Sequence, residues 1–228
     1  MALVKGFDHV CRMSRWRTLE RILTKAVEQG NELFFVQIGA NDGVIYDPIH
    51  AFVRKSNWRG VLVEPVRVYF DRLKENYRDN DRLSFENVAI SDRRERRDFY
   101  RIQENIPFLP EWVNGLGTFD RDILMTHTWA IPDLDRYVVN ETIECISFRN
   151  LIEKHRVEKI DLLVVDTEGY DHEILKQVDF DTLAPAILLY EHQYIDRQQR
   201  LKLENSLIAR GYQLSWHFGN TLAYFPGD

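Results

Sequence analysis

The sequence predicts an α/β fold built on an open parallel sheet that ends in an antiparallel hairpin. Short apolar runs alternate with segments of helical periodicity, as expected when helices cover both faces of a parallel sheet. These runs occupy residues 33–38, 60–64, 83–90, 142–147, 160–165 and 186–190. Two last strand-like segments, 212–216 and 221–225, flank the tetrapeptide HFGN and indicate a hairpin. One sheet therefore accounts for most of the chain.

Helices are expected between the strands because each intervening segment has one apolar side. The first ends at Gly30, a common helix stop. Asp47, followed by Pro48, and later Asp171 are expected to cap helices, since an aspartate side chain accepts hydrogen bonds from the first free N–H groups. The expected helices are 13–29, 47–57, 68–77, 149–155, 171–178 and 196–210. A short extra strand is expected at 97–102.

Length and charge limit the classes of function. The 228 residues suit one domain, 1–228, with a helical extension at 1–30. A net charge of −6 provides no overall field for nucleic acid or an anionic membrane. Cys11 and Cys145 define neither a disulfide framework nor a zinc site, and no signal peptide or membrane span is visible. We therefore expect a cytoplasmic protein whose N-terminal helix covers the domain or forms a homo-oligomer contact.

The segment 103–140 interrupts the α/β rhythm. It holds several prolines and glycines together with Trp112, His127 and Trp129. Long irregular segments inside a compact domain are usually functional or mobile. Two interpretations stay open at this stage: a lid over a site, or a surface excursion packed by its own aromatic residues.

The most informative feature is a pair of segments, FFVQIGANDG at 34–43 and GVLVEP at 60–65. An apolar strand runs into a small-residue turn at Gly39 and Ala40, and the next strand ends on the carboxylate of Glu64. In an open parallel sheet ligands bind beyond the carboxyl ends of the strands, and a carboxylate there can accept hydrogen bonds from ribose hydroxyls. The glycine spacing is G-x-x-x-G, without the third glycine of dinucleotide binders. The pair therefore favours S-adenosylmethionine (SAM) over NAD.

A second group of polar residues follows two later strands. Asp166 and Glu168 come directly after 160–165, and Glu191 and His192 come after 186–190. All four are expected at the same edge of the sheet as the proposed cofactor crevice. Three interpretations compete: a divalent cation such as magnesium or manganese, a general base of raised pKa, or carboxylates that only cap turns.

Six segments together resemble FkbM-type SAM-dependent methyltransferases, over residues 33–192. They are VQIGANDG, GVLVEP, NVAISD, ISFRNLI, IDLLVVDTEGYDHEIL and ILLYEH. The resemblance implies a Rossmann-like class I methyltransferase fold with a seven-stranded, mostly parallel sheet. It also implies SAM as cofactor and O-methylation of a hydroxyl on a sugar, glycan or other natural product.

The resemblance carries roles to individual positions. Cofactor contacts are expected from Gln37, Gly39, Ala40, Asn41, Asp42, Glu64, Pro65, Asn87, Ala89 and Ser91. Asp166, Glu168 and His192 are the expected catalytic residues, with Glu168 or His192 as the base. If a magnesium or manganese ion is used, Asp166, Glu191 and His192 are the expected ligands. The acidic turn at Asp42 departs from the family pattern, so that this residue faces either cofactor or acceptor.

Two other classes of function are kept as alternatives. A non-catalytic interaction module on the same fold would use segment 103–140 and the N-terminal helix as its contact surface, but it has no need of clustered carboxylates. An NAD-dependent oxidoreductase is disfavoured by the missing third glycine.

Overall fold

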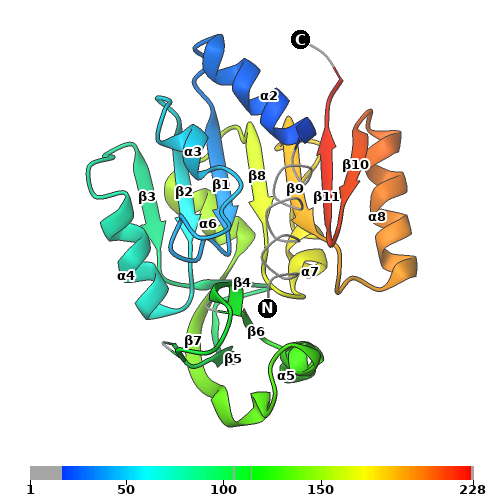
Figure 1. The fold of residues 1–228 in the computed structure, drawn as a ribbon. Coiled ribbons are helices and arrows are strands. Elements are labelled where there is room, and N and C mark those ends of the chain that lie inside the picture. Colours follow the sequence, from blue (N-terminus) through cyan, green and yellow to red (C-terminus); the bar gives the residue numbers. More distant parts are fainter. Residues whose placement is uncertain (1–16, 105, 114, 227–228) are drawn as a thin grey trace.

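A computed structural model describes residues 17–104, 106–113 and 115–226, and shows one large sheet with a smaller one below it (Figure 1). The large sheet has seven strands in the order β10-β11-β9-β8-β1-β2-β3. The five strands from β9 to β3 are parallel, and β11 pairs antiparallel with both β9 and β10. The strands are β1 Phe34–Ile38, β2 Arg59–Val63, β3 Leu83–Glu86, β8 Leu162–Val165, β9 Ile187–Glu191, β10 Gln213–His217 and β11 Asn220–Tyr224. The predicted parallel sheet with its terminal hairpin is confirmed, except that the expected strand 142–147 belongs to the smaller sheet as part of β7 (Val138–Ser147).

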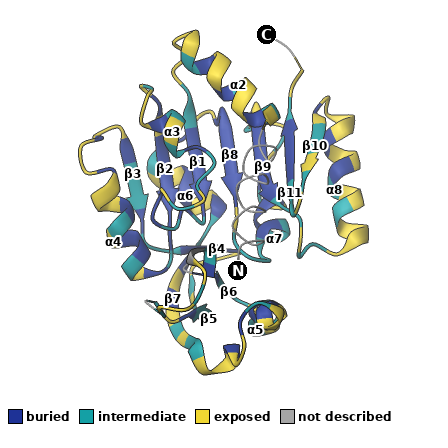
Figure 2. Cartoon of the chain, in the orientation of Figure 1, coloured by how far each residue is buried: buried dark blue, intermediate teal, exposed yellow. Residues whose placement is uncertain are grey.

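Helices pack on both faces of this sheet. One face carries α2 (Arg17–Glu28), α3 (His50–Val53) and α4 (Arg67–Asn76), and the other α6 (Phe148–His155), α7 (Asp171–Leu175) and α8 (Arg197–Ala209). The central strands are buried on both sides, while the outer faces of the helices are exposed (Figure 2). This double burial explains why the strands are continuous apolar runs rather than alternating patterns.

The expected strand 83–90 is wrong, because the chain divides there between two sheets. β3 ends at Glu86, and β4 (Ala89–Ser91) joins a second sheet of order β4-β7-β5-β6. The side chain of Asn87 donates to the backbone carbonyls of Glu64 and Pro65, both at 2.9 Å, and holds the turn between them. The second sheet comprises β4, β5 (Glu95–Ile102), β6 (Gly117–Thr118) and β7 (Val138–Ser147). The apolar pattern of residues 83–90 alone could not show that the chain passes from one sheet to the other there.

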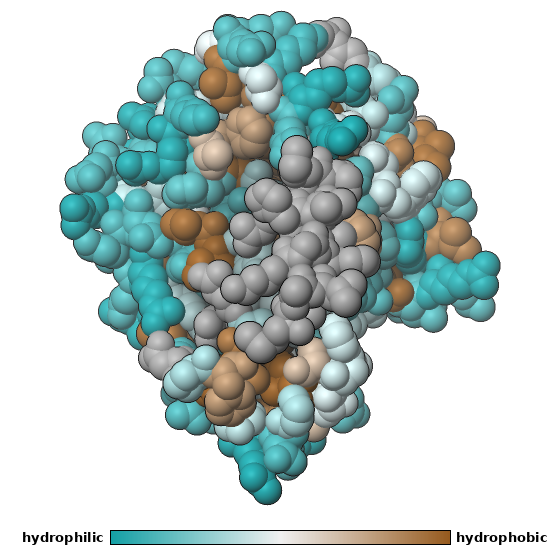
Figure 3. Space-filling view, in the orientation of Figure 1, coloured by the Kyte–Doolittle hydropathy of each residue, from teal (hydrophilic) through white to brown (hydrophobic). Residues whose placement is uncertain are grey.

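Segment 103–140 connects β5 to β7 and lies beyond the carboxyl ends of the parallel strands (Figure 1). It contains α5 (Arg121–Met125) and three short 3₁₀ helices, η1 (Glu111–Val113), η2 (Thr126–Trp129) and η3 (Leu134–Tyr137). It has its own buried cluster, which includes Leu124, Ile131 and Leu134. Apolar side chains gather on this lower part of the surface (Figure 3). We call residues 103–140 the insert.

Two expected helix caps have different outcomes. Asp47 Oδ1 accepts hydrogen bonds from the backbone N–H groups of Ile49 and His50, at 2.7 and 2.8 Å, although α3 begins only at His50. Asp171 lies inside α7 rather than before it, and its carboxylate is turned into the protein. The start of the expected helix 13–29 and Cys11 lie outside the described residues, and Cys145 is buried.

Among residues 17–226 that the structure describes, no helix has the length and apolar character needed to cross a membrane.

Candidate active site

A cleft of about 1810 Å³ opens beyond the carboxyl ends of β1, β2, β8 and β9. The turn after β1 and the end of β2 form one part of its wall, the turn after β8 a second, and the insert a third. Single small-molecule sites usually measure roughly 300–1,000 Å³. The cleft is therefore large enough for a cofactor and an acceptor side by side.

Gly39 permits the close approach that forms the floor of the cleft. Its φ of +82° is a left-handed conformation that favours glycine. A Cβ at this position would collide with the backbone oxygen of Asp166. The turn after β1 and the end of β8 therefore meet with no side chain between them.

Glu64 organises the cofactor half of the cleft. Its Oε2 accepts a hydrogen bond from the backbone N–H of Asn41, and its Oε1 accepts one from that of Val66, both at 2.8 Å. Burial raises the pKa of Glu64 to about 7, against the lowering effect of these two bonds. Each carboxylate oxygen keeps a second lone pair, so that the group can also accept from ligand hydroxyls.

Gln37 supplies a polar atom that fits a ligand. The side chain is 3% exposed, and its Nε2 donates to Asp47 Oδ2 at 3.0 Å. This bond fixes the amide, and leaves Oε1 without a partner among the described residues. Gln37 lines the cleft, so that Oε1 is ready to accept from a donor group such as the ammonium of an amino-acid moiety. The hydrogen-bond acceptors of this half of the cleft therefore fit an adenosine cofactor with an amino-acid tail.

The expected cofactor residues divide into two groups. Gln37, Gly39, Ala40, Asn41, Glu64, Pro65 and Ala89 line the cleft. The others hold the backbone that forms its wall: Asp42 Oδ1 accepts from the N–H groups of Val44 and Ile45, Asn87 bonds the two carbonyls after β2, and Ser91 Oγ donates to the carbonyl of Arg93. Asp42 is thus a turn residue rather than a wall of the site.

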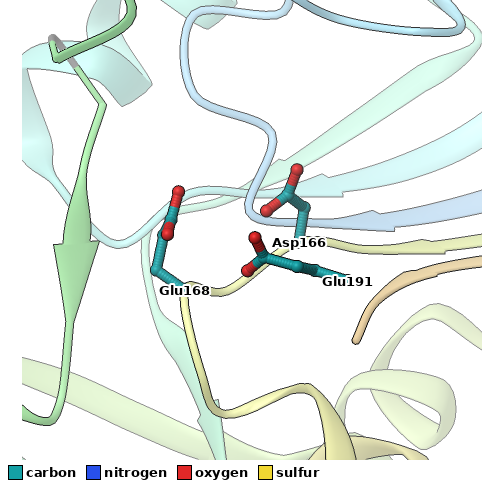
Figure 4. Close-up of side chains that lie close together, drawn as sticks. All are labelled: Asp166, Glu168 and Glu191. Atoms are coloured by element: carbon teal, nitrogen blue, oxygen red, sulfur yellow. The ribbon is translucent and has the colours of Figure 1, made fainter. Parts of the chain in front are cut away.

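Three carboxylates converge in the same cleft, at or just beyond the ends of β8 and β9 (Figure 4). Asp166 follows β8, Glu168 lies two residues further in the turn, and Glu191 ends β9. One oxygen of each lies within 4.8 Å of the others. Oxygen atoms so arranged can share a proton or hold a hard divalent cation such as magnesium or manganese.

The pKa of Glu168 is raised to about 8. Burial is the main cause, and the negative charges of Asp166 and Asp171 add to it. Asp171 has a pKa raised to about 7, again mainly through burial. It accepts a 2.8 Å hydrogen bond from Thr167 Oγ1 and so supports the turn that carries Glu168. A carboxyl group with a pKa near 8 exchanges its proton in the range where enzymes work.

The structure separates His192 from these carboxylates, which corrects its expected place beside Asp166 and Glu191. Its Nδ1 lies 2.8 Å from Thr221 Oγ1, and burial lowers its pKa. It lines a shallow hollow next to α8 rather than the cleft. Adjacent residues of a strand point to opposite faces, so Glu191 and His192 diverge where the sequence suggested a cluster.

Several residues of the cleft were not among the expected site residues. The insert contributes Trp112, Phe119 and His127, and the core adds Tyr170, Tyr194 and Asn220. Tyr170 and Phe119 lie edge to face at 5.0 Å between ring centres. The sequence did carry some signal for them: Tyr170 lies in the motif at 160–175, Trp112 and His127 lie in the segment that could be a lid, and Tyr194 follows Glu191 by three residues.

Comparisons with known proteins point to one family. Residues 37–220 match the family described as Methyltransferase FkbM domain. The crystal structure of methyltransferase FkbM from Methylobacillus flagellatus KT has a TM-score of 0.51 at 17% identity, and the match covers 85% of this chain and 44% of that one. A methyltransferase from Geobacter sulfurreducens gives 0.47 at 13% identity, over 100% of this chain and 90% of that one. No curated protein sequence matches the chain.

The fold is that of a class I methyltransferase. The chain belongs to the FkbM family of SAM-dependent methyltransferases, since the family match covers most of its length. It spans less than half the length of the Methylobacillus protein.

Proposed function

We propose that this protein is an O-methyltransferase that transfers the methyl group of SAM to a hydroxyl of a sugar, glycan or other natural product. The observation that carries the proposal is that Asp166, Glu168 and Glu191 lie close together in the cleft that Glu64 and Gln37 also line. A hydroxyl is a poor nucleophile at neutral pH, and a base must take its proton. Carboxylates beside a cofactor pocket meet that requirement.

Gln37, Gly39 and Glu64 are proposed to hold the cofactor. Glu64 accepts from the ribose hydroxyls, and Gln37 Oε1 accepts from the ammonium of the amino-acid tail. When bound, SAM supplies an electrophilic methyl group. Alignment of acceptor and cofactor then contributes most of the rate, because displacement at carbon requires the reacting atoms in line.

Glu168 is proposed as the general base. Glu168 would take the proton of the acceptor hydroxyl, and the oxygen could then accept the methyl group that bound SAM would supply, as the carbon–sulfur bond breaks and S-adenosylhomocysteine leaves. The charge of Asp166 keeps the proton affinity of Glu168 high. The aromatic rings of Trp112, Phe119 and Tyr170 give flat walls on which a sugar ring or an apolar scaffold can stack.

A divalent cation is the alternative use of the three carboxylates. We propose the proton-sharing form instead, because His192, one of the three expected ligands, lines a separate hollow rather than the cleft. Exhaustive treatment with EDTA is then expected to leave the rate unchanged. A rate that EDTA abolishes and manganese restores would replace the base by a metal site.

The proposal is tested by formation of S-adenosylhomocysteine from SAM with a panel of methyl glycosides and aliphatic alcohols. Asp166→Asn is expected to lower turnover by ~10²-fold or more and to leave the melting temperature nearly unchanged. Full activity of this variant would reject the assignment. Calorimetry with S-adenosylhomocysteine separates the alternatives, because tight binding without any methyl transfer would favour a non-catalytic module.

A further inference from the structure

Tyr194 connects the insert to the carboxylate turn. It follows β9 by three residues and lines the cleft. Its hydroxyl oxygen lies 3.0 Å from Nε2 of His127, which belongs to η2 of the insert and is 9% exposed. The two rings are edge to face, with 6.5 Å between their centres.

The same hydroxyl is also bonded on its other side. A Cβ added to Gly169, the residue after Glu168, would lie 3.5 Å from Tyr194 Cβ, so that Tyr194 packs against the carboxylate turn. From this position a hydrogen bond with the Tyr194 side chain lowers the pKa of Glu168 against the larger effect of burial. One tyrosine hydroxyl therefore lies between the insert and the carboxyl group proposed as the base.

The direction of these bonds follows from counting protons. When Glu168 is ionised, as a base must be, its carboxylate only accepts, so Tyr194 donates its one hydroxyl proton to it. The bond to His127 must then run the other way, from a ring N–H to the tyrosine oxygen. Burial lowers the pKa of His127 and so favours the neutral ring, and this order of bonds requires its proton on Nε2. The order is His127 to Tyr194 to Glu168.

Further contacts keep His127 in place. Its ring lies 5.6 Å from that of Trp112, another residue of the insert. Four residues earlier in the insert, Ile123 packs against Gly169, so closely that a Cβ on Gly169 would collide with Ile123 Cδ1. Gly169 directly follows Glu168. The insert thus contacts the carboxylate turn at two independent points.

The geometry points to Tyr194 and His127 as a positioning pair, through which the insert fixes the Glu168 carboxyl group for the acceptor. This inference rests on the proposed role of Glu168. It assigns a function to the insert beyond covering the cleft: residues 103–140 supply one end of the hydrogen-bonded chain that orients the base.

The test compares five proteins: wild type, Tyr194→Phe, His127→Leu, His127→Gln and the control Tyr137→Phe. Tyr137 is a tyrosine of the insert that packs on Phe108 and does not line the cleft. A glutamine at position 127 keeps an N–H donor near the place of Nε2, whereas leucine keeps only the volume. Crystal structures give the position of the Glu168 carboxyl group, and S-adenosylhomocysteine formation with the active methyl glycoside gives kcat and KM.

Tyr194→Phe and His127→Leu are expected to move the Glu168 carboxyl group by ~1 Å or more and to lower kcat by ~10-fold or more. KM for SAM and the melting temperature should stay near the wild-type values. His127→Gln is expected to recover most of the rate, and Tyr137→Phe to match wild type.

An unmoved Glu168 in both Tyr194→Phe and His127→Leu overturns the inference. It also fails if His127→Gln is as slow as His127→Leu, because packing rather than hydrogen bonding would then be what matters. If wild type methylates none of the panel, the proposed function fails, while the crystal structures still decide whether the pair positions Glu168.

Discussion

The backbone N–H of Asn41 donates to Oε2 of Glu64 at 2.8 Å, and this bond ties the turn after β1 to the end of β2. The second oxygen of Glu64 holds the N–H of Val66. Glu64 therefore shapes the cofactor half of the cleft as well as lining it, so a change at this residue affects both binding and the shape of the turn.

Glu64→Gln is predicted to weaken S-adenosylhomocysteine binding by ~10-fold or more, measured by calorimetry. A glutamine amide has one acceptor oxygen, so one of the two backbone N–H groups would face an NH₂ group and lose its partner. Glu144→Gln, an exposed change on the second sheet, is the matched control and should bind as wild type does. Equal affinity of both variants would exclude Glu64 from the cofactor site.

Gly115→Ala is predicted to weaken S-adenosylhomocysteine binding by ~5-fold or more, although Gly115 lies in the insert. Its φ is +125°, and a Cβ there would collide with Nδ2 of Asn41 in the turn after β1. The variant should push the insert and that turn apart.

Gly30→Ala is the control for Gly115→Ala. Gly30 also has a positive φ, of +69°, but a Cβ there would meet nothing within 4 Å. Gly30→Ala carries a left-handed backbone penalty of about 1 kcal/mol. Gly115→Ala carries a larger one, because a φ of +125° lies outside the left-handed well, and only this variant touches the cofactor turn. If Gly115→Ala and Gly30→Ala weaken S-adenosylhomocysteine binding equally, the effect is one of general stability. The contact between the insert and the turn after β1 would then make no contribution to cofactor binding.

The sequence predicted the large sheet well because each strand is an apolar run closed by a recognisable turn. It also placed Glu64, Asp166 and Glu168 at one edge, since parallel strands end at the same side. His192 was misplaced because alternation along β9 turns neighbours to opposite faces, which a cluster of polar letters conceals. The sequence marked the insert as a lid or a surface excursion but could not predict its contacts: Tyr194 and His127 are 67 residues apart, and only tertiary packing brings them together.

kcat at saturating SAM is predicted to rise with pH and to level off above about pH 8. Glu168 must be ionised to accept the acceptor proton, and its pKa is raised to about 8. Below that value the ionised fraction, and with it kcat, should fall about tenfold per pH unit. The pKa of Glu64 is also raised, but ionisation of Glu64 affects cofactor binding, so saturating SAM removes its effect on the pH dependence of the rate. A kcat that is constant between pH 6 and 9, or that falls over this range, would exclude Glu168 as the base.

Glu168→Gln is predicted to stabilise the unliganded protein at pH 8.5 and to have little effect at pH 5. The pKa of Glu168 is raised from 4.5 to about 8 in the folded state, so between these values the folded protein binds more protons than the unfolded chain. The free energy of unfolding of wild type therefore falls as pH rises through this window. Glutamine does not ionise, so the melting temperature of Glu168→Gln at pH 8.5 should exceed that of wild type by ~3 °C or more.

Glu173→Gln is the control, and its effect should have the opposite sign. Lys176 lowers the pKa of Glu173, so that this change removes a favourable charge. An equal gain at pH 5 and pH 8.5 would mean that the effect of Glu168→Gln comes from packing rather than from the buried charge.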